Sequence, residues 1–335
     1  MRVAELKDNK IILAERDRCT LEGKEGAIVK VLGCGLCGSD IVKYREHLKP
    51  DGTVLGHEIV AEIVEINSKT NFKVGDRVVA SHHIPCFKCA YCKGESYSMC
   101  EHFKSTNIIP GGFSEYVYLS EEHLFNVTHK IPKNLTEQEV AFYEPLGCCV
   151  RAVKRAKLVP QSSVLVIGLG TIGLLMGQAL KSFGMKVFGC DLNEERIEIA
   201  NKLGIIAFNS SEKEYTHNFV FERTNNIGID CIFMTSGADA AIDVALNTVR
   251  LGGKILVFSS TPKNFGYLNN DIYYKELTVL GSYSPRPKDL KKSLELLTNG
   301  EVNVKGLSTV YPIEDIQKAF DDTIENKVMK AYIKF

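Results

Sequence analysis

Short apolar runs rich in β-branched residues recur through the first 150 residues, and Gly, Asn, Asp and Lys separate them. The clearest runs are 27–32, 59–66 and 77–80. Runs of this length, bounded by turn-forming residues, predict strands rather than helices. We therefore expect a β-rich domain over this part of the chain.

The pattern changes after about residue 150. Residues 163–168 form a continuous apolar run, as a strand buried on both faces requires. Helical patterns then alternate with similar apolar runs at 186–190, 231–234 and 254–259. Alternating strands and helices predict a doubly wound, parallel α/β sheet. Beyond about 285, the pattern predicts a helix at 288–299 and a last strand at 331–335.

Composition adds bounds to this picture. The chain has 335 residues, 44% of them hydrophobic, which is typical of a globular protein with room for two domains. Lys plus Arg and Asp plus Glu both number 41, so charge gives no reason to expect nucleic acid or a membrane surface as partner. Residues 1–8 carry charges where a signal peptide needs an apolar stretch, which favours a cytoplasmic protein. The apolar segment 164–180 contains four glycines and fits a strand, turn and helix better than a membrane span.

Four cysteines lie within fifteen residues in the spacing C-x2-C-x2-C-x7-C, at Cys86, Cys89, Cys92 and Cys100. Four thiolates can saturate one tetrahedral metal ion without another ligand. A ferredoxin-type motif opens in the same way but continues with x3-Cys-Pro and usually has a second set, so zinc is favoured over an iron–sulfur cluster. Disulfides are disfavoured because the chain has an odd number of cysteines, eleven, and lacks a secretory signal.

A glycine-rich motif, G-x-G-x-x-G, follows the apolar run at 163–168. Gly168 would allow the tight turn, Gly170 the approach of a pyrophosphate, and Gly173 close packing of helix and strand. Asp191 ends the next predicted strand, 18 residues beyond Gly173, near the spacing of a ribose-binding acid. Its carboxylate would repel a 2′-phosphate, so we expect NAD rather than NADP. A site for S-adenosylmethionine is the main alternative for this domain taken alone.

A second group of metal-ligand residue types is spread along the β-rich domain. Cys37 follows a predicted strand, His57 and Glu58 precede one, and Glu144 precedes the α/β region. Cys, His and Glu are suitable ligands for a zinc ion that keeps an open position for substrate. Their spacing alone is only suggestive, because a lone His-Glu pair more often belongs to an ordinary loop.

Together these features resemble the zinc-dependent medium-chain dehydrogenase/reductase family, in its polyol (sorbitol-type) and threonine dehydrogenase branch. The resemblance covers nearly the whole chain and rests on the two groups of metal-ligand types, the glycine motif and segments 74–78, 112–117 and 251–253. It implies a GroES-like catalytic domain at 1–150 and 285–335, with a structural zinc lobe at about 82–104. It also implies a Rossmann NAD-binding domain at 151–284.

The resemblance also implies a role for each site residue. Catalytic zinc would be held by Cys37, His57 and Glu58, with Glu144 as a further ligand, direct or through water, and Ser39 would pass the substrate proton outward. Structural zinc would be held by Cys86, Cys89, Cys92 and Cys100, which makes two zinc ions per chain. NAD would contact Gly168, Gly170, Ile172, Gly173, Asp191, Arg196 and the backbone around Ser259. A homodimer or homotetramer is expected.

The expected activity is zinc- and NAD-dependent oxidation of a secondary alcohol to a ketone, on a polyol, sugar or sugar-derived alcohol. L-Threonine 3-dehydrogenase and a simple secondary-alcohol dehydrogenase are alternatives. Zinc-free quinone and enoyl reductases share the fold but lack this ligand set. A non-enzymatic zinc-ribbon module is disfavoured by the neutral charge balance and the lack of a basic stretch around the cysteine cluster.

Two departures from the family pattern concern the substrate and its proton. Many members place a histidine five residues after the ligand cysteine, where this chain has Val42, so His47 or water would complete the relay. Sorbitol-type enzymes usually carry an aromatic residue next to this position, where the chain has Lys43. They also carry an Arg-Tyr pair in the segment where this chain has Ser284 and Pro285, followed by Arg286. Lys43 or Arg286 is a candidate to face an anionic group on the substrate. The alternative is that both are solvated surface cations.

Overall fold

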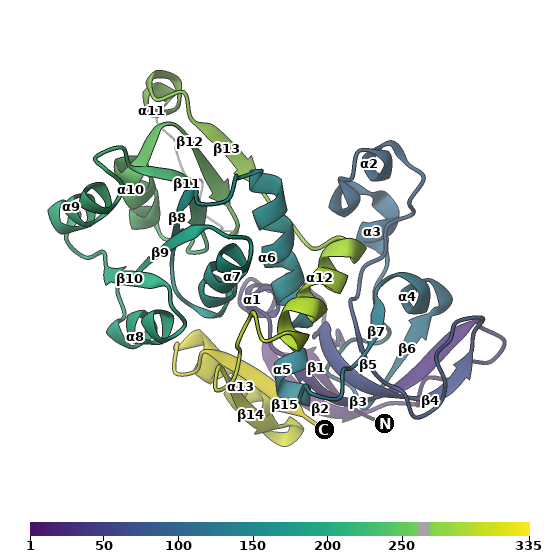
Figure 1. Cartoon of the computed structure of the whole chain (residues 1–335). Coiled ribbons are helices and arrows are strands. Elements are labelled where there is room, and N and C mark those ends of the chain that lie inside the picture. Colours follow the sequence, from purple (N-terminus) through teal and green to yellow (C-terminus); the bar gives the residue numbers. More distant parts are fainter. Residues whose placement is uncertain (260–268) are drawn as a thin grey trace. The chain divides into compact units, whose positions relative to one another are not determined.

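The computed structural model describes residues 1–259 and 269–335, and the chain folds into two compact units (Figure 1). Unit 1 comprises Met1–Glu144, Arg286–Thr298 and Val304–Phe335. Unit 2 comprises Pro145–Pro285 and Asn299–Asn303. The chain thus leaves the β-rich unit twice, first to build most of the second unit and then briefly at Asn299–Asn303, before its last residues complete the first unit.

Unit 1 is built on a mixed sheet in the order β14-β15-β3-β4-β5-β7, with β6 paired to β3. Its neighbours pair antiparallel except β14 and β15, and β1 with β2 forms a separate hairpin. The strands of unit 1 are β1 (Arg2–Lys7), β2 (Lys10–Glu15), β3 (Gly26–Gly35), β4 (Glu58–Asn67), β5 (Arg77–Ala80), β6 (Tyr116–Ser120), β7 (Thr128–Lys130), β14 (Ser308–Pro312) and β15 (Lys330–Lys334). The predicted strands of the first 150 residues are therefore confirmed as β3, β4 and β5.

Short helices fill the connections of unit 1. They are α1 (Gly38–Arg45), α2 (Ala90–Lys93), η1 (Tyr97–Met99), α3 (Glu101–Ser105), α4 (Glu121–Asn126), α5 (Glu137–Val140), α12 (Pro287–Thr298), η2 (Ile313–Asp315) and α13 (Ile316–Ile324). Helix α6 (Tyr143–Ala156) starts in unit 1 and continues into unit 2. The hydroxyl of Ser293 on α12 donates to the carbonyl of Tyr143 at 2.7 Å, which fixes the start of α6 within unit 1.

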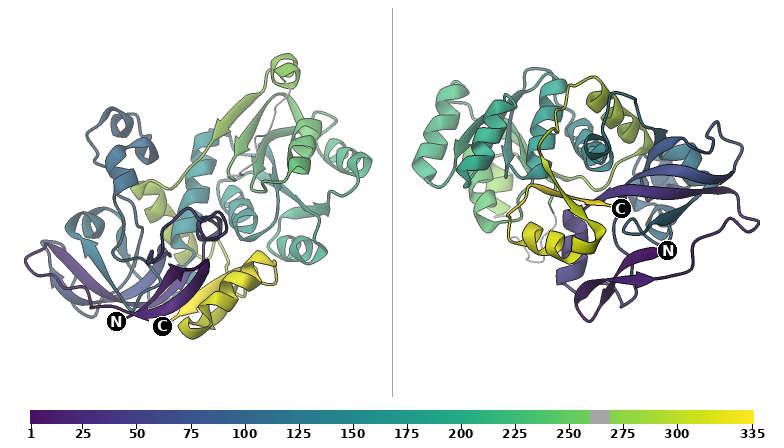
Figure 2. Two further views of the ribbon diagram at one scale, coloured as in Figure 1. Left: turned by 180° about the vertical axis from the view of Figure 1, so that it is seen from behind. Right: turned by 90° about the horizontal axis from the view of Figure 1, so that it is seen from below.

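The two ends of the chain share one hydrophobic core in unit 1. Buried residues of β1, β3, β4, α13 and β15 belong to a single cluster. The backbone N–H of Ile11 in β2 donates to Gln317 of α13 at 2.8 Å, and Figure 2 shows the C-terminal helix beside the N-terminal hairpin. Residues more than 300 positions apart in the sequence therefore stabilise the same fold.

Unit 2 is a six-stranded parallel sheet in the order β10-β9-β8-β11-β12-β13, with helices on both faces (Figure 1). Its strands are β8 (Ser163–Ile167), β9 (Lys186–Asp191), β10 (Ile206–Asn209), β11 (Ile229–Met234), β12 (Val249–Val257) and β13 (Thr278–Gly281). Its helices after α6 are α7 (Thr171–Ser182), α8 (Glu194–Lys202), α9 (Lys213–Arg223), α10 (Asp239–Thr248) and α11 (Asn269–Tyr274). From β8 the chain adds strands toward one edge of the sheet, and from β11 it adds them toward the other edge. Doubly wound sheets bind their ligands at this switch point between β8 and β11.

The apolar segment 164–180 forms most of β8, the glycine turn and most of α7. Val164, Leu165 and Val166 are fully buried, as expected for a central strand covered by helices on both faces. The prediction of a strand, turn and helix is confirmed. No helix within the described ranges is both long and apolar enough to cross a membrane.

Alanine substitution of glycine would measure how tightly the turn before β4 is packed. Gly56 has φ +86°, and a Cβ there would lie 2.9 Å from the backbone nitrogen of Phe113, whereas Gly75 has φ +87° and open space. We expect Gly75→Ala to lower the free energy of unfolding by about 1–2 kcal/mol, the cost of left-handed backbone alone. Gly56→Ala should cost roughly 1–3 kcal/mol more because the close contact adds overpacking. Urea unfolding of both variants checks this, and equal losses would contradict it.

Candidate active site and metal centres

The pairing of β3 with β4 assembles the first candidate metal centre. Gly35 lies opposite Glu58 in this antiparallel ladder, so Cys37, two residues beyond, comes close to the start of β4. The ligand atoms of Cys37, His57 and Glu58 all lie within 4.8 Å of one another. His57 and Glu58 are buried, and one carboxylate oxygen of Glu58, Oε1, is buried without a hydrogen-bond partner among the described residues. A thiol, an imidazole and an oxygen without a partner fit a zinc ion that keeps one position open.

Cys37 is presented by the start of a helix. Its Sγ accepts from the backbone N–H of Ser39 at 3.5 Å and caps α1. This hydrogen bond places the sulfur at the start of the helix. The predicted ligand and the predicted proton carrier, Ser39, are thereby brought together, and Ser39 is exposed.

Asp40 lies behind the imidazole of His57, a role that the sequence reasoning did not assign. It is fully buried, with Oδ2 3.4 Å from His57 Nδ1 and Oδ1 3.4 Å from Lys43 Nζ. Burial by itself raises the pKa of Asp40, but His57 and Lys43 outweigh it and lower that pKa to about 2. The ionised carboxylate orients the imidazole, as in carboxylate–histidine–zinc arrangements. Its place three residues after Cys37, in the first turn of the helix that Cys37 caps, was the available signal.

Lys330 is the second group that sequence reasoning missed. The first residue of β15 lies next to the site, and its ammonium donates to Oε2 of Glu58 from a buried position. Burial lowers the pKa of Lys330, but Glu58 and Cys37 outweigh this effect and raise it. A carbon at Gly35 would lie 2.1 Å from the same Glu58 oxygen, so glycine leaves room for the ion pair. No local pattern could reveal a partner 272 residues away in sequence.

The remaining residues predicted for this centre lie at different places around it. Glu144 is buried in the first turn of α6, and its charge raises the pKa of Lys330. It is not among the residues whose ligand atoms all lie within 4.8 Å of one another. Val42 is 40% exposed. His47 is exposed just beyond α1, with φ 50°. The structure does not bring His47 into a hydrogen bond with Ser39, and the relay beyond Ser39 stays a prediction.

A row of aromatic rings begins at His57. The ring centroid of His82 lies 4.4 Å from that of His57, His83 follows at 3.9 Å, and Phe103 lies 4.8 Å beyond His83. Burial lowers the pKa of His82 well below its ordinary value, and the nearby His57, His83 and Lys43 lower it further. Burial also lowers the pKa of His83 to about 4. Both rings are therefore neutral near pH 7, and Phe103 packs against the cysteine cluster.

The second candidate metal centre is the cysteine cluster predicted from spacing. The sulfurs of Cys86, Cys89, Cys92 and Cys100 lie within 4.8 Å of one another, and Cys86 and Cys92 are 3.9 Å apart. This separation is far too long for a disulfide, and all four are free thiols. Backbone N–H groups of Lys88 and Cys89 lower the pKa of Cys86 to about 6, which favours the thiolate that zinc requires. Four sulfurs in this arrangement fit a closed tetrahedral zinc site.

Salt bridges link the cysteine lobe to Lys288 at the start of α12 and to Arg286 just before it. Glu95 lies between the third and fourth cysteines and accepts from Arg286 at 2.8 Å and from Lys288. Arg286 also makes two bonds to Asp289, at 2.6 and 3.1 Å, and is only 8% exposed. Its guanidinium is therefore engaged by two carboxylates, neither solvated nor left to face a substrate anion. Of the two predicted candidates, only Lys43 lies beside the catalytic cluster.

The glycine motif of unit 2 forms the turn between β8 and α7. Gly168 has φ +93°, and a Cβ on Gly173 would lie 1.9 Å from the carbonyl oxygen of Gly168. A Cβ on Gly170, which caps α7, would meet nothing within 4 Å. The turn thus leads directly into the start of α7, and helix starts at this place in doubly wound folds are where phosphates bind. Ile172 lies in the first turn of this helix.

Asp191 ends β9 beside the same turn. Its carboxylate accepts from the N–H groups of Leu169 at 2.6 Å, Leu192 at 2.8 Å and Asn193 at 3.0 Å. Arg196 on α8 lies 3.8 Å from it. These donors fix an acidic group next to the glycine turn, where a cofactor ribose would lie. Ser259 lies just beyond β12, the strand on the other side of β11 from β8.

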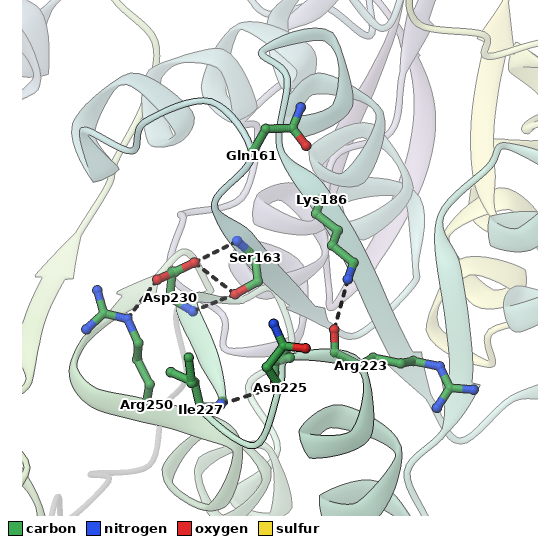
Figure 3. Close-up of a pocket in the computed structure, with 10 residues that line it drawn as sticks. Gln161, Ser163, Lys186, Arg223, Asn225, Ile227, Asp230 and Arg250 are labelled. Atoms are coloured by element: carbon green, nitrogen blue, oxygen red, sulfur yellow. Dashed lines mark hydrogen bonds and ion pairs between the residues drawn. The ribbon is translucent and has the colours of Figure 1, made fainter.

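A polar pocket of about 450 Å³ opens at the opposite end of the strands, where β8, β9 and β11 begin (Figure 3). Its side chains largely bond to one another. Asp230 accepts from the N–H of Ser163 at 2.7 Å and from Arg250 at 2.7 Å, while Lys186 donates to the carbonyl of Arg223 at 2.8 Å. These bonds join the strand beginnings, and the pocket is remote from the glycine turn at the strand ends.

Comparison with known proteins agrees with both units. Residues 23–132 match the family described as alcohol dehydrogenase GroES-like domain, and residues 171–299 match zinc-binding dehydrogenase. A probable D-xylulose reductase A of Aspergillus terreus is 33% identical, covering 93% of this chain and 92% of its own. D-Arabitol-phosphate dehydrogenase of Enterococcus avium is 31% identical, covering 92% and 89%. The solved structure of alcohol dehydrogenase TADH from Thermus sp. ATN1 superposes with a TM-score of 0.88 at 25% identity, covering 100% of this chain and 99% of its own.

The matches confirm the predicted combination of a GroES-like catalytic fold with a Rossmann-type parallel sheet. Relatives above 30% identity that span more than nine tenths of the chain leave no large segment outside the resemblance. The chain belongs to the zinc-dependent medium-chain dehydrogenase/reductase family of alcohol and polyol dehydrogenases.

Proposed function

We propose that this protein oxidises a secondary hydroxyl group of a polyol, sugar or sugar-derived alcohol to a ketone and transfers the hydride to NAD. The observation that carries the proposal is the convergence of Cys37, His57 and Glu58 in one unit of a chain whose other unit forms the glycine turn between β8 and α7. The relatives named for xylulose and arabitol phosphate support the substrate class. Unit 1 would be the catalytic domain, at about 1–150 and 285–335, and unit 2 the cofactor domain, at about 151–284.

In the catalytic centre, Cys37, His57 and Glu58 would hold zinc, with Glu144 as a further ligand, directly or through water. Bound zinc supplies a Lewis acid that lowers the pKa of the substrate hydroxyl. Asp40 keeps the His57 imidazole in its orientation, and Lys330 does the same for Glu58. Ser39 receives the hydroxyl proton and passes it toward solvent, which its exposed position allows.

The cofactor site would be formed by unit 2. Gly168, Gly170 and Gly173 let the pyrophosphate approach the start of α7, beside Ile172. Asp191 would accept bonds from the adenosine ribose, with Arg196 nearby, and the backbone around Ser259 would lie near the nicotinamide. The acidic group disfavours the 2′-phosphate of NADP, so NAD is the proposed cofactor.

The cysteine lobe would hold the second zinc of each chain through Cys86, Cys89, Cys92 and Cys100. A closed site of this kind stabilises the fold and leaves no position for substrate. The salt bridges from Glu95 to Arg286 and Lys288, at the start of α12, support a structural role.

We further propose that the substrate carries an anionic group, such as a phosphate, which Lys43 binds. Lys43 makes a long contact of 3.4 Å with Asp40, and its side chain is 31% exposed. Its charge lowers the pKa of the nearby His82 and His83, which places it close to the catalytic centre. An ammonium group has three donors, so the contact with Asp40 leaves capacity for an anion. D-Arabitol-phosphate dehydrogenase among the relatives supports this substrate class.

Assembly as a homodimer or homotetramer is also proposed, through the edge of the sheet in unit 2. Strand β13 pairs with β12 on one side and has no strand on its other side among the described residues. Three of its four residues are exposed. An exposed edge of this kind can pair with the same strand of a second copy.

Zinc content and turnover together test the main proposal. We expect two zinc ions per chain by elemental analysis and NADH formation on polyols such as xylitol or sorbitol, or on their phosphates. Cys37→Ser should lower turnover about a thousandfold or more in a folded protein, because the Lewis acid supplies several kcal/mol. Cys89→Ser should instead lower the zinc content to one and reduce the melting temperature. A fully active Cys37→Ser enzyme would refute the assigned catalytic centre.

Cofactor choice tests the role of Asp191. We expect Asp191→Asn to lower the ratio of kcat/KM with NAD to kcat/KM with NADP roughly tenfold or more, because repulsion of the 2′-phosphate costs several kcal/mol. Glu194→Gln makes the same charge change three residues along, at the start of α8, and serves as the control. Steady-state kinetics with both cofactors measure the ratio, and an equal shift in the two variants would speak against the assignment.

Substrate charge tests the role of Lys43. We expect kcat/KM for a pentitol phosphate to exceed that for the free pentitol, and Lys43→Met to reduce this preference about tenfold or more, as loss of a charged hydrogen bond predicts. Lys43→Arg should keep most of the preference. Equal activity of the unmodified enzyme on neutral and phosphorylated pentitols would exclude the anionic substrate.

A further inference from the structure

The histidine that follows β5, His82, is held rigidly by its neighbours in the chain. The backbone N–H of Ser81 donates to the carbonyl of Val127 at 3.0 Å, and the carbonyl of His82 bonds the ring of His123 at 3.1 Å. The ring of His83 bonds the carbonyl of Thr106 at 2.6 Å. Hydrogen bonds therefore anchor the backbone at His82 and the ring of the residue after it.

The imidazole of His82 lies against that of His57, one of the proposed zinc ligands, with the planes tilted by 45°. Its Nδ1 atom is buried and lacks a hydrogen-bond partner within the described ranges, although the residue as a whole is partly exposed. A buried N–H without an acceptor is rarer in folded proteins than an unpaired acceptor. This favours the neutral tautomer that carries its proton on Nε2.

We propose that His82 determines substrate specificity, with Nε2 donating a hydrogen bond to a second hydroxyl of the substrate. This inference rests on the proposed function and narrows it to alcohols with a hydroxyl next to the carbon that is oxidised. The short distance between the rings of His57 and His82 favours the neighbouring carbon over one further along the chain. Lys43 would bind a more distant anionic group, so two contacts of different chemistry would orient one polyol.

A purely structural role is the competing explanation, because His82 also lies in the row of rings that continues through His83 to Phe103. Phenylalanine at position 82 would keep a ring in that row and remove both ring nitrogens. Asparagine would lose the ring and keep a donor. The two substitutions therefore separate hydrogen bonding from packing.

The experiment compares a vicinal diol, 2,3-butanediol, with 2-butanol, a monohydric alcohol of the same carbon skeleton. We expect His82→Phe to lower the ratio of kcat/KM for the diol to that for 2-butanol about tenfold, as loss of one hydrogen bond predicts. His82→Asn should recover part of the ratio. His83→Phe is the matched control, because His83 is one ring further from His57, and its ratio should change less than twofold.

Zinc content and melting temperature are measured on each variant, and both should match the unmodified enzyme for His82→Phe. Loss of zinc, or an equal fall on both alcohols, would assign His82 to packing and overturn the inference. An unchanged ratio in an active enzyme would overturn it as well, while leaving the proposed function intact. An unmodified enzyme that oxidises no diol or polyol would instead refute the proposed function together with the inference.

Discussion

The antiparallel pairing of β3 with β4 is the constraint on which the catalytic centre depends. It sets Gly35 opposite Glu58, and from that register the thiol of Cys37 and the imidazole of His57 arrive at the same point. A shift by one residue would turn the side chains of β4 to the opposite face of the sheet and separate the three groups. The shared core of unit 1, which joins both ends of the chain, keeps this register in place.

Burial makes the charges around this centre mutually dependent. Asp40 has no exposure, and Glu58 and Lys330 are almost inaccessible. Removing one member of such a group leaves an uncompensated buried charge, which costs several kcal/mol. Asp40 is balanced by His57 and Lys43, and Glu58 by Lys330. The protein thus supplies oriented ligands whose positions do not depend on solvent, which is what a catalytic metal site requires.

The two candidate metal centres differ in how they are built. All four ligands of the cysteine lobe come from one short segment, which the ion pairs of Glu95 with Arg286 and Lys288 and of His102 with Glu122 tie to the remaining unit. The catalytic centre draws its groups from α1, β4 and β15. A locally built site can act as a self-contained structural element. A site assembled from distant elements exists only when the whole unit is folded.

The sequence by itself determined the features whose partners are near in the chain. The cysteine spacing, the glycine turn with Asp191, and the alternation of strands and helices each follow from short-range geometry. Only the tertiary structure decided that Lys330 pairs with Glu58, that His82 lies against His57, and that Arg286 is engaged by Glu95 and Asp289. Most of these pairings join residues far apart in sequence. Which of many Lys, His or Arg side chains reaches a given partner depends on strand register and packing, which local patterns do not encode.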